Sequence, residues 1–276
     1  MTAPEPPALS TMRLAIDGEI GTLTLDRPDR LNAMSPELIG ELAEVMPWLA
    51  EDARLRALIV TGAGRAFSAG GDVSWFRRGL DDPDVDLPES VRQGAEVLHR
   101  GIEALRRIPY PVVAAINGVA AGAGVSLALA CDVRIASADA FFAIAYGRIG
   151  ASPDGGMTYF LPRVIGPARA IEILLEDPDM PAREALERGL VTEVVEAGEL
   201  AAVARARAEA LAAKAPHYVR MSKLLVAASL QHGLAEHLAL ERDGIAASMA
   251  TEDLRAGVTA FFAGEPPRFG GAEPRN

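Results

Sequence analysis

The apolar residues of this chain fall into short stretches whose spacing alternates between that of strands and that of helices. Residues 14–16 and 21–25 lie on either side of the turn Asp17-Gly18, which predicts a β-hairpin. Ser35 and Pro36 then predict a helix start, with the serine as N-cap and the proline in the first turn. The apolar positions that follow have helical spacing: Leu38, Leu42, Val45, Met46 and Leu49.

Strands and helices continue to alternate as far as residue 200. Strands are predicted at residues 57–61, 112–116 and 133–136, and helices at 91–107 and 125–130. This alternation implies crossover connections and an α/β fold. The acidic, proline-containing stretch 80–88 predicts a mobile loop. Strand-like spacing then ends, and the predicted helices are residues 201–213, 218–230, 234–249 and 254–262.

These patterns divide the chain into three parts. We expect a loose N-terminal tail over residues 1–10, an α/β core over residues 11–200 and a C-terminal helical region over residues 201–276. No apolar run is long enough to span a membrane, and the proline-containing N-terminus does not resemble a signal peptide. With its single cysteine, Cys131, which excludes an internal disulfide, the chain is expected in the cytoplasm.

Two short runs of small residues are the most informative local feature. Residues 66–72 and 120–124 contain Gly70, Gly71, Gly122 and Gly124, and each run follows a predicted strand. Such a strand end leaves backbone N–H groups free to point at a ligand, with no side chain in the way. Two such ends can aim two N–H groups at one oxygen. That arrangement is an oxyanion hole, which stabilises negative charge on a carbonyl.

Charge and composition exclude several other classes. The net charge of −11 argues against a protein that binds nucleic acid. Neither glycine run has the G-x-G-x-x-G spacing of a dinucleotide-binding fold. The histidines show no metal-binding spacing, so they are interpreted as structural or surface residues and no metal is expected: His99, His217, His232 and His237.

Several motifs, taken together and in order, resemble a known family. They are residues 24–34, 56–62, 66–72, 111–118, 122–124, 131–132 and 153–166. This set is similar to the enoyl-CoA hydratase/isomerase (crotonase) superfamily, and it is closest to the Asp-dependent isomerase-like members. The resemblance implies a crotonase-like spiral of ββα units with a C-terminal helical region. It also implies a homo-oligomer, a trimer or a dimer of trimers.

The resemblance further implies where the substrate binds. The N–H groups of Gly71 and Ala123 would bind the thioester carbonyl of an acyl-CoA, whose coenzyme A is part of the substrate, so no separate cofactor is expected. The residues predicted to contact the substrate or its CoA portion are Arg27, Arg30, Ser68, Ala69, Asp72 and Tyr146. The arginines would contact phosphates, and the backbone at residues 68–69 would contact adenine. Surface roles for the arginines and turn hydrogen bonds for Asp72 are open alternatives.

Four more aromatic or charged positions are candidates beside the substrate. Trp75 and Phe76 directly follow the first glycine run, so they either wall the acyl pocket or pack in the core. Phe261 and Arg268, near the C-terminus, would reach a CoA held by a neighbouring subunit.

The carboxylates depart from the hydratase pattern. Hydratases of this family hold a water between two glutamates, and those positions fall on Ser126 and Tyr146 here. Neither residue serves as a carboxylate base near neutral pH. Asp154 remains, at the place where the isomerases carry an aspartate facing the acyl chain. The alternative is that Asp154 caps a helix beginning at Gly155.

A single carboxylate is enough to shift a double bond, because it can take a proton from one carbon and return it to another. We therefore expect an enoyl-CoA isomerase with Asp154 as acid and base. The alternatives are a hydratase that positions water with Asp154 and Tyr146, and a non-catalytic protein that binds acyl-CoA.

Overall fold

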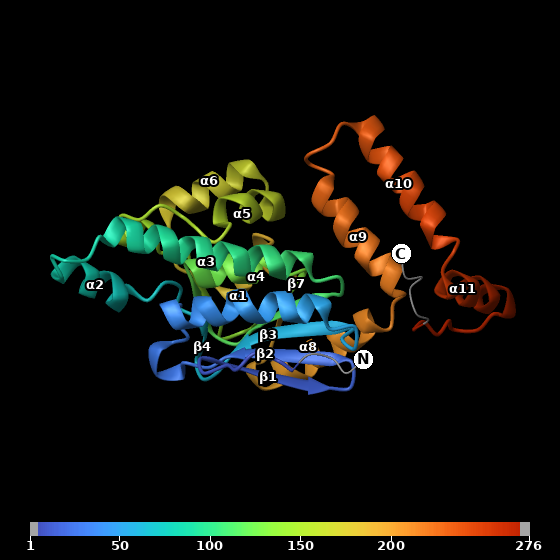
Figure 1. The fold of residues 1–276 in the computed structure, drawn as a ribbon, viewed down its shortest axis with the longest axis horizontal. Helices are drawn as coiled ribbons and strands as arrows, with labels where there is room; N and C mark the ends of the chain where they lie inside the picture. The colour runs from blue at the N-terminus through green and yellow to red at the C-terminus, as the bar shows by residue number, and fades with distance from the viewer. Residues whose placement is uncertain (1–4, 271–276) are drawn as a thin grey trace.

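A six-stranded sheet, a smaller four-stranded sheet and the helices packed around them form the body of the protein, and further helices extend from one end (Figure 1). The computed structural model describes residues 5–270, so residues 1–4 of the predicted tail and residues 271–276 lie outside the described part. The Ser10 hydroxyl and the Thr11 N–H donate to Glu41 at 2.6 and 3.0 Å. These bonds tie the chain to the body from Ser10 onward.

The larger sheet begins with the predicted hairpin, which is confirmed. Its strands, in spatial order, are β1 (Met12–Asp17), β2 (Ile20–Leu25), β3 (Ala57–Gly62), β5 (Val112–Ile116), β7 (Val133–Ser137) and β10 (Glu193–Val195). β1 and β2 are antiparallel, whereas each later neighbour pairs in parallel. Parallel pairing needs crossover connections, and helices supply them here.

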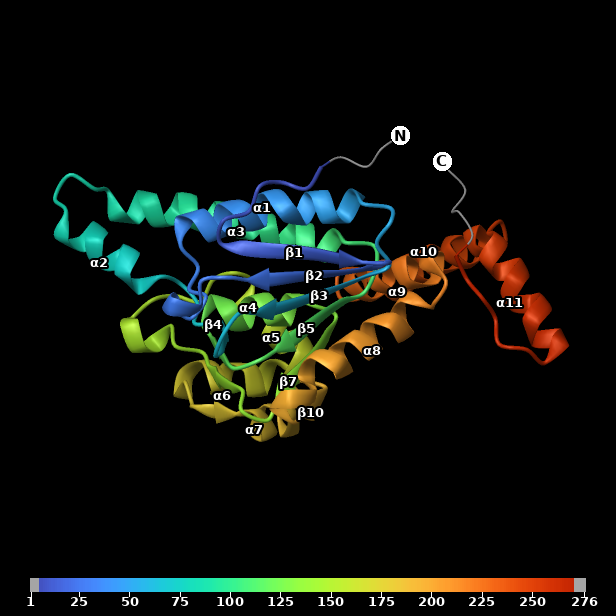
Figure 2. The same cartoon turned by 90° about the horizontal axis from the view of Figure 1, so that it is seen from below.

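The central strands are buried on both faces. On β3, Leu58 and Val60 belong to the apolar core that includes helices α1 (Pro36–Glu51) and α3 (Leu87–Arg107). Ala57 and Ile59 face the opposite way, toward helix α8 (Leu200–Ala212), which lies on the other side of the sheet (Figure 2). A strand with apolar residues on both faces reads as a continuous apolar run, which is why it was recognisable in the sequence.

The smaller sheet was not predicted. Its strands are β4 (Ala66–Ser68), β6 (Val119–Ala121), β8 (Phe141–Ala143) and β9 (Met180–Pro181). Residues 66–68 of the first glycine run form β4, and residues 120–121 of the second belong to β6. A short strand therefore stands between each long strand, β3 or β5, and the glycines that the prediction placed at its end. Strands of two or three residues show no alternation, so their spacing carries no signal.

The remaining helices of the body are α2 (Val73–Asp81), α4 (Ala123–Ala130), α5 (Met157–Ile165), α6 (Pro167–Glu176) and α7 (Ala182–Glu187). Short 3₁₀ helices occur at Pro28–Arg30, Gly147–Ile149 and Ala197–Glu199. The predicted acidic loop is shorter than expected, because α2 runs to Asp81 and α3 begins at Leu87. Asp86 accepts a hydrogen bond from the Glu89 N–H as the N-cap of α3, so this aspartate starts a helix.

The C-terminal helices lie within a few residues of their predicted bounds. They are α8, α9 (Pro216–Ala228), α10 (Leu234–Ser248) and α11 (Glu252–Ala263). α8 packs on the large sheet, whereas α9, α10 and α11 extend beyond it (Figures 1 and 2). The boundary at residue 200 stays a prediction. Within residues 5–270, no helix is both long enough and apolar enough to cross a membrane.

A partly buried ion pair connects α9 to the body. The Lys223 ammonium donates to the Asp132 carboxylate at 2.6 Å and to the Tyr110 carbonyl at 2.8 Å. Asp132 also accepts from Arg106 at 3.2 Å and from the Val112 N–H at 2.8 Å. Burial lowers the pKa of Lys223, and the nearby Asp132 partly offsets this effect. The pair therefore joins the extended helices to the end of strand β5.

Replacing Lys223 by methionine should destabilise the protein by about 2 kcal/mol, because two hydrogen bonds to a charged group are lost. Lys214→Met, at an exposed position in the turn before α9, is the matched control and should change stability by less than about 0.5 kcal/mol. The free energy of unfolding in urea measures both effects. Equal stability of the two variants would contradict a stabilising role for the pair.

Candidate functional site

The two glycine runs lie against each other, backbone to backbone. A Cβ at Gly70, whose φ is 85°, would lie 2.6 Å from the Ala121 carbonyl oxygen and 3.2 Å from the Ala123 nitrogen. A Cβ at Gly124 would lie 2.3 Å from the Ser68 carbonyl oxygen. Only glycine permits this approach. The contact places the amides of Gly71 and Ala123 in neighbouring segments at one end of the small sheet.

Both amides are free to donate to a ligand. Met34 forms an isolated bridge opposite Gly71, in which the Met34 N–H donates to the Gly70 carbonyl at 2.7 Å and the Asp72 N–H donates to the Met34 carbonyl at 3.2 Å. The Gly71 N–H therefore points away from Met34. Ala123 is the first residue of α4, where N–H groups have no acceptor inside the helix. Among the described residues, neither amide has an acceptor. This arrangement agrees with the predicted oxyanion hole, and the positive end of the α4 dipole lies at the Ala123 amide.

Asp154 is held by the two residues that occupy the glutamate positions of the hydratase pattern. The Tyr146 hydroxyl donates to Asp154 Oδ1 at 2.6 Å, and the Ser126 hydroxyl donates to the Asp154 carbonyl at 3.0 Å. The Ser126 and Tyr146 oxygens are 3.4 Å apart. Because Ser126 lies one turn after Gly122 on α4, these bonds connect Asp154 to the helix whose first amide is Ala123.

The helix-cap alternative for Asp154 is wrong. Helix α5 begins at Met157, its N-cap is Gly156, and no side chain caps it. The Asp154 carbonyl accepts from the Met157 N–H, while its partly buried carboxylate accepts from Tyr146. The carboxylate is therefore available for a role other than capping.

Tyr146 is a neutral hydrogen-bond donor in this site. Burial raises the pKa of its phenol above the ordinary value, and the negative charge of Asp154 raises it further. A Cβ at Gly122 would lie 3.8 Å from Tyr146 Cζ, which places the ring beside the turn that starts α4. The phenol thus lies between this turn and Asp154.

Arg27 and Asp72 pair with each other. Their closest atoms are 3.3 Å apart, and Arg27 also donates to the Ala33 carbonyl. Asp72 is the N-cap of α2 and accepts hydrogen bonds from the Ser74 N–H and hydroxyl. Burial alone would raise the pKa of Asp72, but hydrogen bonds from Ser74 and Arg27 hold it below its ordinary value. The turn role of Asp72 is confirmed, and contact of either residue with CoA stays a prediction.

The other predicted CoA contacts differ in exposure. Arg30 is exposed at the surface. Ser68 is fully buried, and its hydroxyl donates to the Asn32 carbonyl at 2.9 Å, so only the backbone near Ala69 is open. The Ala69 N–H already donates to the Leu31 carbonyl at 2.9 Å. Adenine binding at this segment would therefore depend on the Ala69 carbonyl.

Two aromatic side chains of α2 lie beside the first glycine run. A Cβ at Gly71 would lie 3.5 Å from Phe76 Cζ, and the Trp75 ring packs against Gly94 of α3. The two rings contact each other with centroids 5.5 Å apart. This position agrees with a wall of the space in front of the Gly71 amide.

One residue near Asp154 was missed. The Gly155 N–H donates to His99 Nε2 at 3.2 Å, although the sequence suggested only a structural or surface role for this histidine. The partners are 56 residues apart, and no local pattern connects them. Cys131 is fully buried, and burial raises the pKa of its thiol to about 12.

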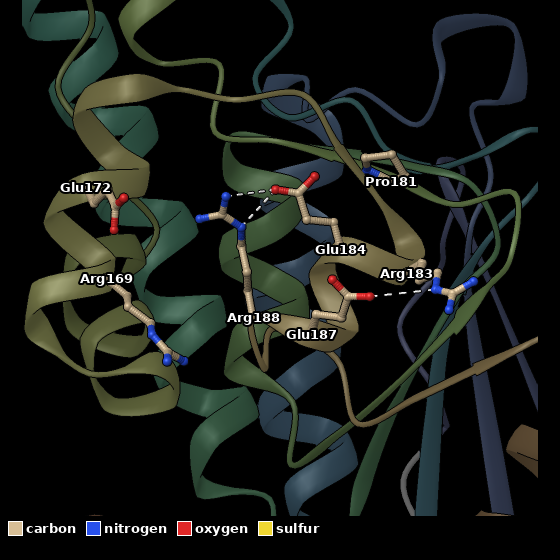
Figure 3. A pocket seen from close by; sticks show the side chains of 7 residues that line it. All are labelled: Arg169, Glu172, Pro181, Arg183, Glu184, Glu187 and Arg188. Atoms are coloured by element: carbon tan, nitrogen blue, oxygen red, sulfur yellow. Dashed lines mark hydrogen bonds and ion pairs between the residues drawn. The ribbon is translucent and has the colours of Figure 1, made fainter.

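Two hollows lie outside this constellation. Figure 3 shows one between α6 and α7, where Arg188 pairs with Glu184 at 2.8 Å and Arg183 with Glu187 at 3.6 Å. Its charges largely neutralise one another, and none of the predicted site residues lines it. The other hollow, of about 700 Å³, lies among α9, α10 and α11 and includes Phe261.

Comparisons with known proteins agree with the fold and with the resemblance. The model of the enoyl-CoA hydratase/isomerase family matches residues 15–272. The 1,2-epoxyphenylacetyl-CoA isomerase of Escherichia coli is 38% identical over 256 residues, which cover 93% of this chain and 97% of that protein. The short-chain-enoyl-CoA hydratase of Clostridium acetobutylicum is 32% identical over 257 residues, covering 92% of this chain and 95% of that protein.

Solved structures give the same result. The crystal structure of enoyl-CoA hydratase from Bacillus anthracis superposes with a TM-score of 0.87 at 32% identity, covering 95% of this chain and 100% of that one. The expected crotonase-like α/β fold is thereby confirmed. Because the family model and these relatives extend over nearly the whole chain, the protein belongs to the enoyl-CoA hydratase/isomerase family.

Proposed function

We propose that the protein shifts a C=C bond of an enoyl-CoA thioester, with Asp154 as the acid and base. The observation that carries the proposal is the hydrogen bonding of Asp154 to Ser126 and Tyr146. In the hydratase pattern, glutamates at these two positions hold a water. Here the positions carry Ser126 and Tyr146, whose hydroxyls hold Asp154 instead. One proton acceptor beside an oxyanion hole is the equipment of an isomerase.

The reaction removes one proton from the acyl chain and returns it to another carbon of the same chain. Asp154 takes a proton from one carbon of the acyl chain, and the electron pair moves through the conjugated system onto the thioester oxygen. The Gly71 and Ala123 N–H groups stabilise this dienolate, at about 3 kcal/mol per donor. Asp154 then gives the proton to the carbon two positions away. The Tyr146 hydroxyl donates to Oδ1 of Asp154, so Oδ2 remains to accept the substrate proton.

The names of two relatives support the isomerase proposal and also its hydratase alternative. One relative is named 1,2-epoxyphenylacetyl-CoA isomerase, and another is named short-chain-enoyl-CoA hydratase. In a hydratase, Asp154 and Tyr146 together would hold the attacking water. In a non-catalytic acyl-CoA-binding protein, the hole would bind the thioester without any proton exchange.

We also propose that the active form is a homo-oligomer, a trimer or a dimer of trimers, held by α9, α10 and α11. Many large apolar side chains of these helices are exposed, among them Val226, Leu234, Leu238, Phe261 and Phe262. Phe262 is 82% exposed, which is unusual for an aromatic side chain without a partner. An apolar surface of this extent is typical of an interface.

Asp154→Asn should lower turnover of an enoyl-CoA substrate by about a thousandfold, because the proton acceptor is lost. Binding of the CoA ester should persist, since the oxyanion hole is intact. Steady-state kinetics and calorimetric binding measure the two effects. The exposed Asp139→Asn is the matched control and should behave as the wild type. Turnover of Asp154→Asn at the wild-type rate would exclude Asp154 as the base.

The products separate the three functions. In D₂O, an isomerase should give a shifted alkene with deuterium at a carbon of the acyl chain. A hydratase should give the 3-hydroxyacyl-CoA, and a binding protein neither product nor deuterium. Mass spectrometry of the CoA esters distinguishes these outcomes. The 3-hydroxyacyl-CoA as main product would contradict the isomerase proposal.

Tyr146 should make the protein sensitive to alkaline pH. Because its pKa is raised in the folded state, the unfolded chain loses this proton first, near pH 10, and the free energy of unfolding then falls as pH rises. The contribution is about 1.4 kcal/mol per pH unit. Tyr146→Phe should flatten the decline between about pH 10 and 11, whereas Tyr159→Phe at the surface should not. Identical slopes for wild type and Tyr146→Phe would contradict this coupling.

Phe262→Glu should dissociate the oligomer by placing a charge in its apolar interface. Light scattering after size exclusion should give the mass of one chain for this variant and a multiple of it for the wild type. Leu80→Glu, on exposed α2, is the control and should keep the wild-type mass. A monomeric wild type would refute the assembly.

A further inference from the structure

The peptide unit between Asp154 and Gly155 is held at both ends. Its C=O accepts from the Ser126 hydroxyl at 3.0 Å, and its N–H donates to His99 Nε2 at 3.2 Å. Because the two ends of a trans peptide point in opposite directions, the two bonds together fix the rotation of the plane. That plane directly follows the α-carbon from which the Asp154 carboxylate extends.

The segment needs such support. Gly155 is buried with a φ of 59°, a conformation that side chains rarely adopt, and a Cβ there would lie 3.1 Å from Ser126 Cβ. Glycines 155 and 156 both have positive φ, so the backbone after Asp154 is intrinsically free to rotate. His99 extends from α3, an element separate from the α4 that carries Ser126. The two bonds therefore clamp the segment from different helices.

We propose that His99 is a positioning residue that orients Asp154 by accepting the Gly155 N–H. The inference rests on the proposed function of Asp154. Only a neutral imidazole accepts at Nε2, so the proton must lie on Nδ1. A protonated imidazole has an N–H at both positions and cannot accept.

The test uses two substitutions that differ only in the acceptor. His99→Ala removes it, and kcat should fall about tenfold with KM within about twofold, because only the orientation of the base is lost. His99→Gln keeps an oxygen that can accept the Gly155 N–H, and it should restore most of kcat. His237→Gln, on α10, is the control and should keep the wild-type kcat and KM.

A second measurement does not depend on turnover. Hydrogen–deuterium exchange of peptides covering residues 150–160 should be faster in His99→Ala than in the wild type at pH 8, and near wild type in His99→Gln. Wild-type exchange in His99→Ala, or a kcat of His99→Gln as low as that of His99→Ala, would overturn the proposal. If Asp154→Asn retains turnover, the proposed function fails, while the exchange result still decides whether His99 clamps the segment.

Discussion

The close contact between the two glycine runs is the constraint on which the rest of the site depends. The Ser68 carbonyl lies where a side chain at position 124 would begin, so α4 starts in its observed place only with glycine there. The start of α4 positions the Ala123 amide next to the segment that carries Gly71. One turn further along the same helix, Ser126 is brought to the Asp154 carbonyl. The hole and the carboxylate are thus set by one backbone approach.

The rigidity of α4 explains how this geometry is maintained. Every residue of the helix is buried, so packing on all sides fixes its position and the direction of its first amides. Donors held in advance cost little reorganisation when charge develops on a thioester oxygen. The large sheet contributes through β5 and β7, whose faces are packed between the α1 and α3 layer and α8. Asp154, by contrast, lies in a loop that contains two glycines. In this loop, hydrogen bonds from side chains hold the backbone, whereas packing holds that of α4.

The sequence predicted the elements whose signals are local and repeated. The hairpin, α1 and the central strands were predicted from the spacing of their apolar residues. Ser35 caps α1 as expected and accepts from the Leu38 N–H. The small sheet was missed because its strands are only two or three residues long. α8 was recognised as a helix, but its packing on the sheet depends on contacts with β3 and β5, more than eighty residues earlier.

The site shows the same division. The glycine runs predict an oxyanion hole, because a backbone donor needs only the absence of side chains. The Arg27–Asp72 pair and the His99–Gly155 hydrogen bond were beyond this reasoning, since their members are 45 and 56 residues apart. An aspartate before glycines is typical of a helix cap, and the local pattern alone favoured that role about as well as catalysis. The start of α5 at Met157, with Gly156 as its N-cap, excludes the cap.

Tyr146 and Ser126 also change the electrostatics of the site. Two carboxylates around one water repel each other, and such a pair tends to share a proton. Here the Asp154 carboxylate accepts from the Tyr146 hydroxyl, while Ser126 donates to the Asp154 backbone carbonyl. The raised pKa of the Tyr146 phenol means that this hydroxyl donates while keeping its own proton. Under the proposed function, Asp154 would be the group that exchanges protons, and its hydrogen-bond partners would orient it. A reaction that removes and returns the same proton would need no more than this, whereas addition of water would need a second group to deliver the hydroxide.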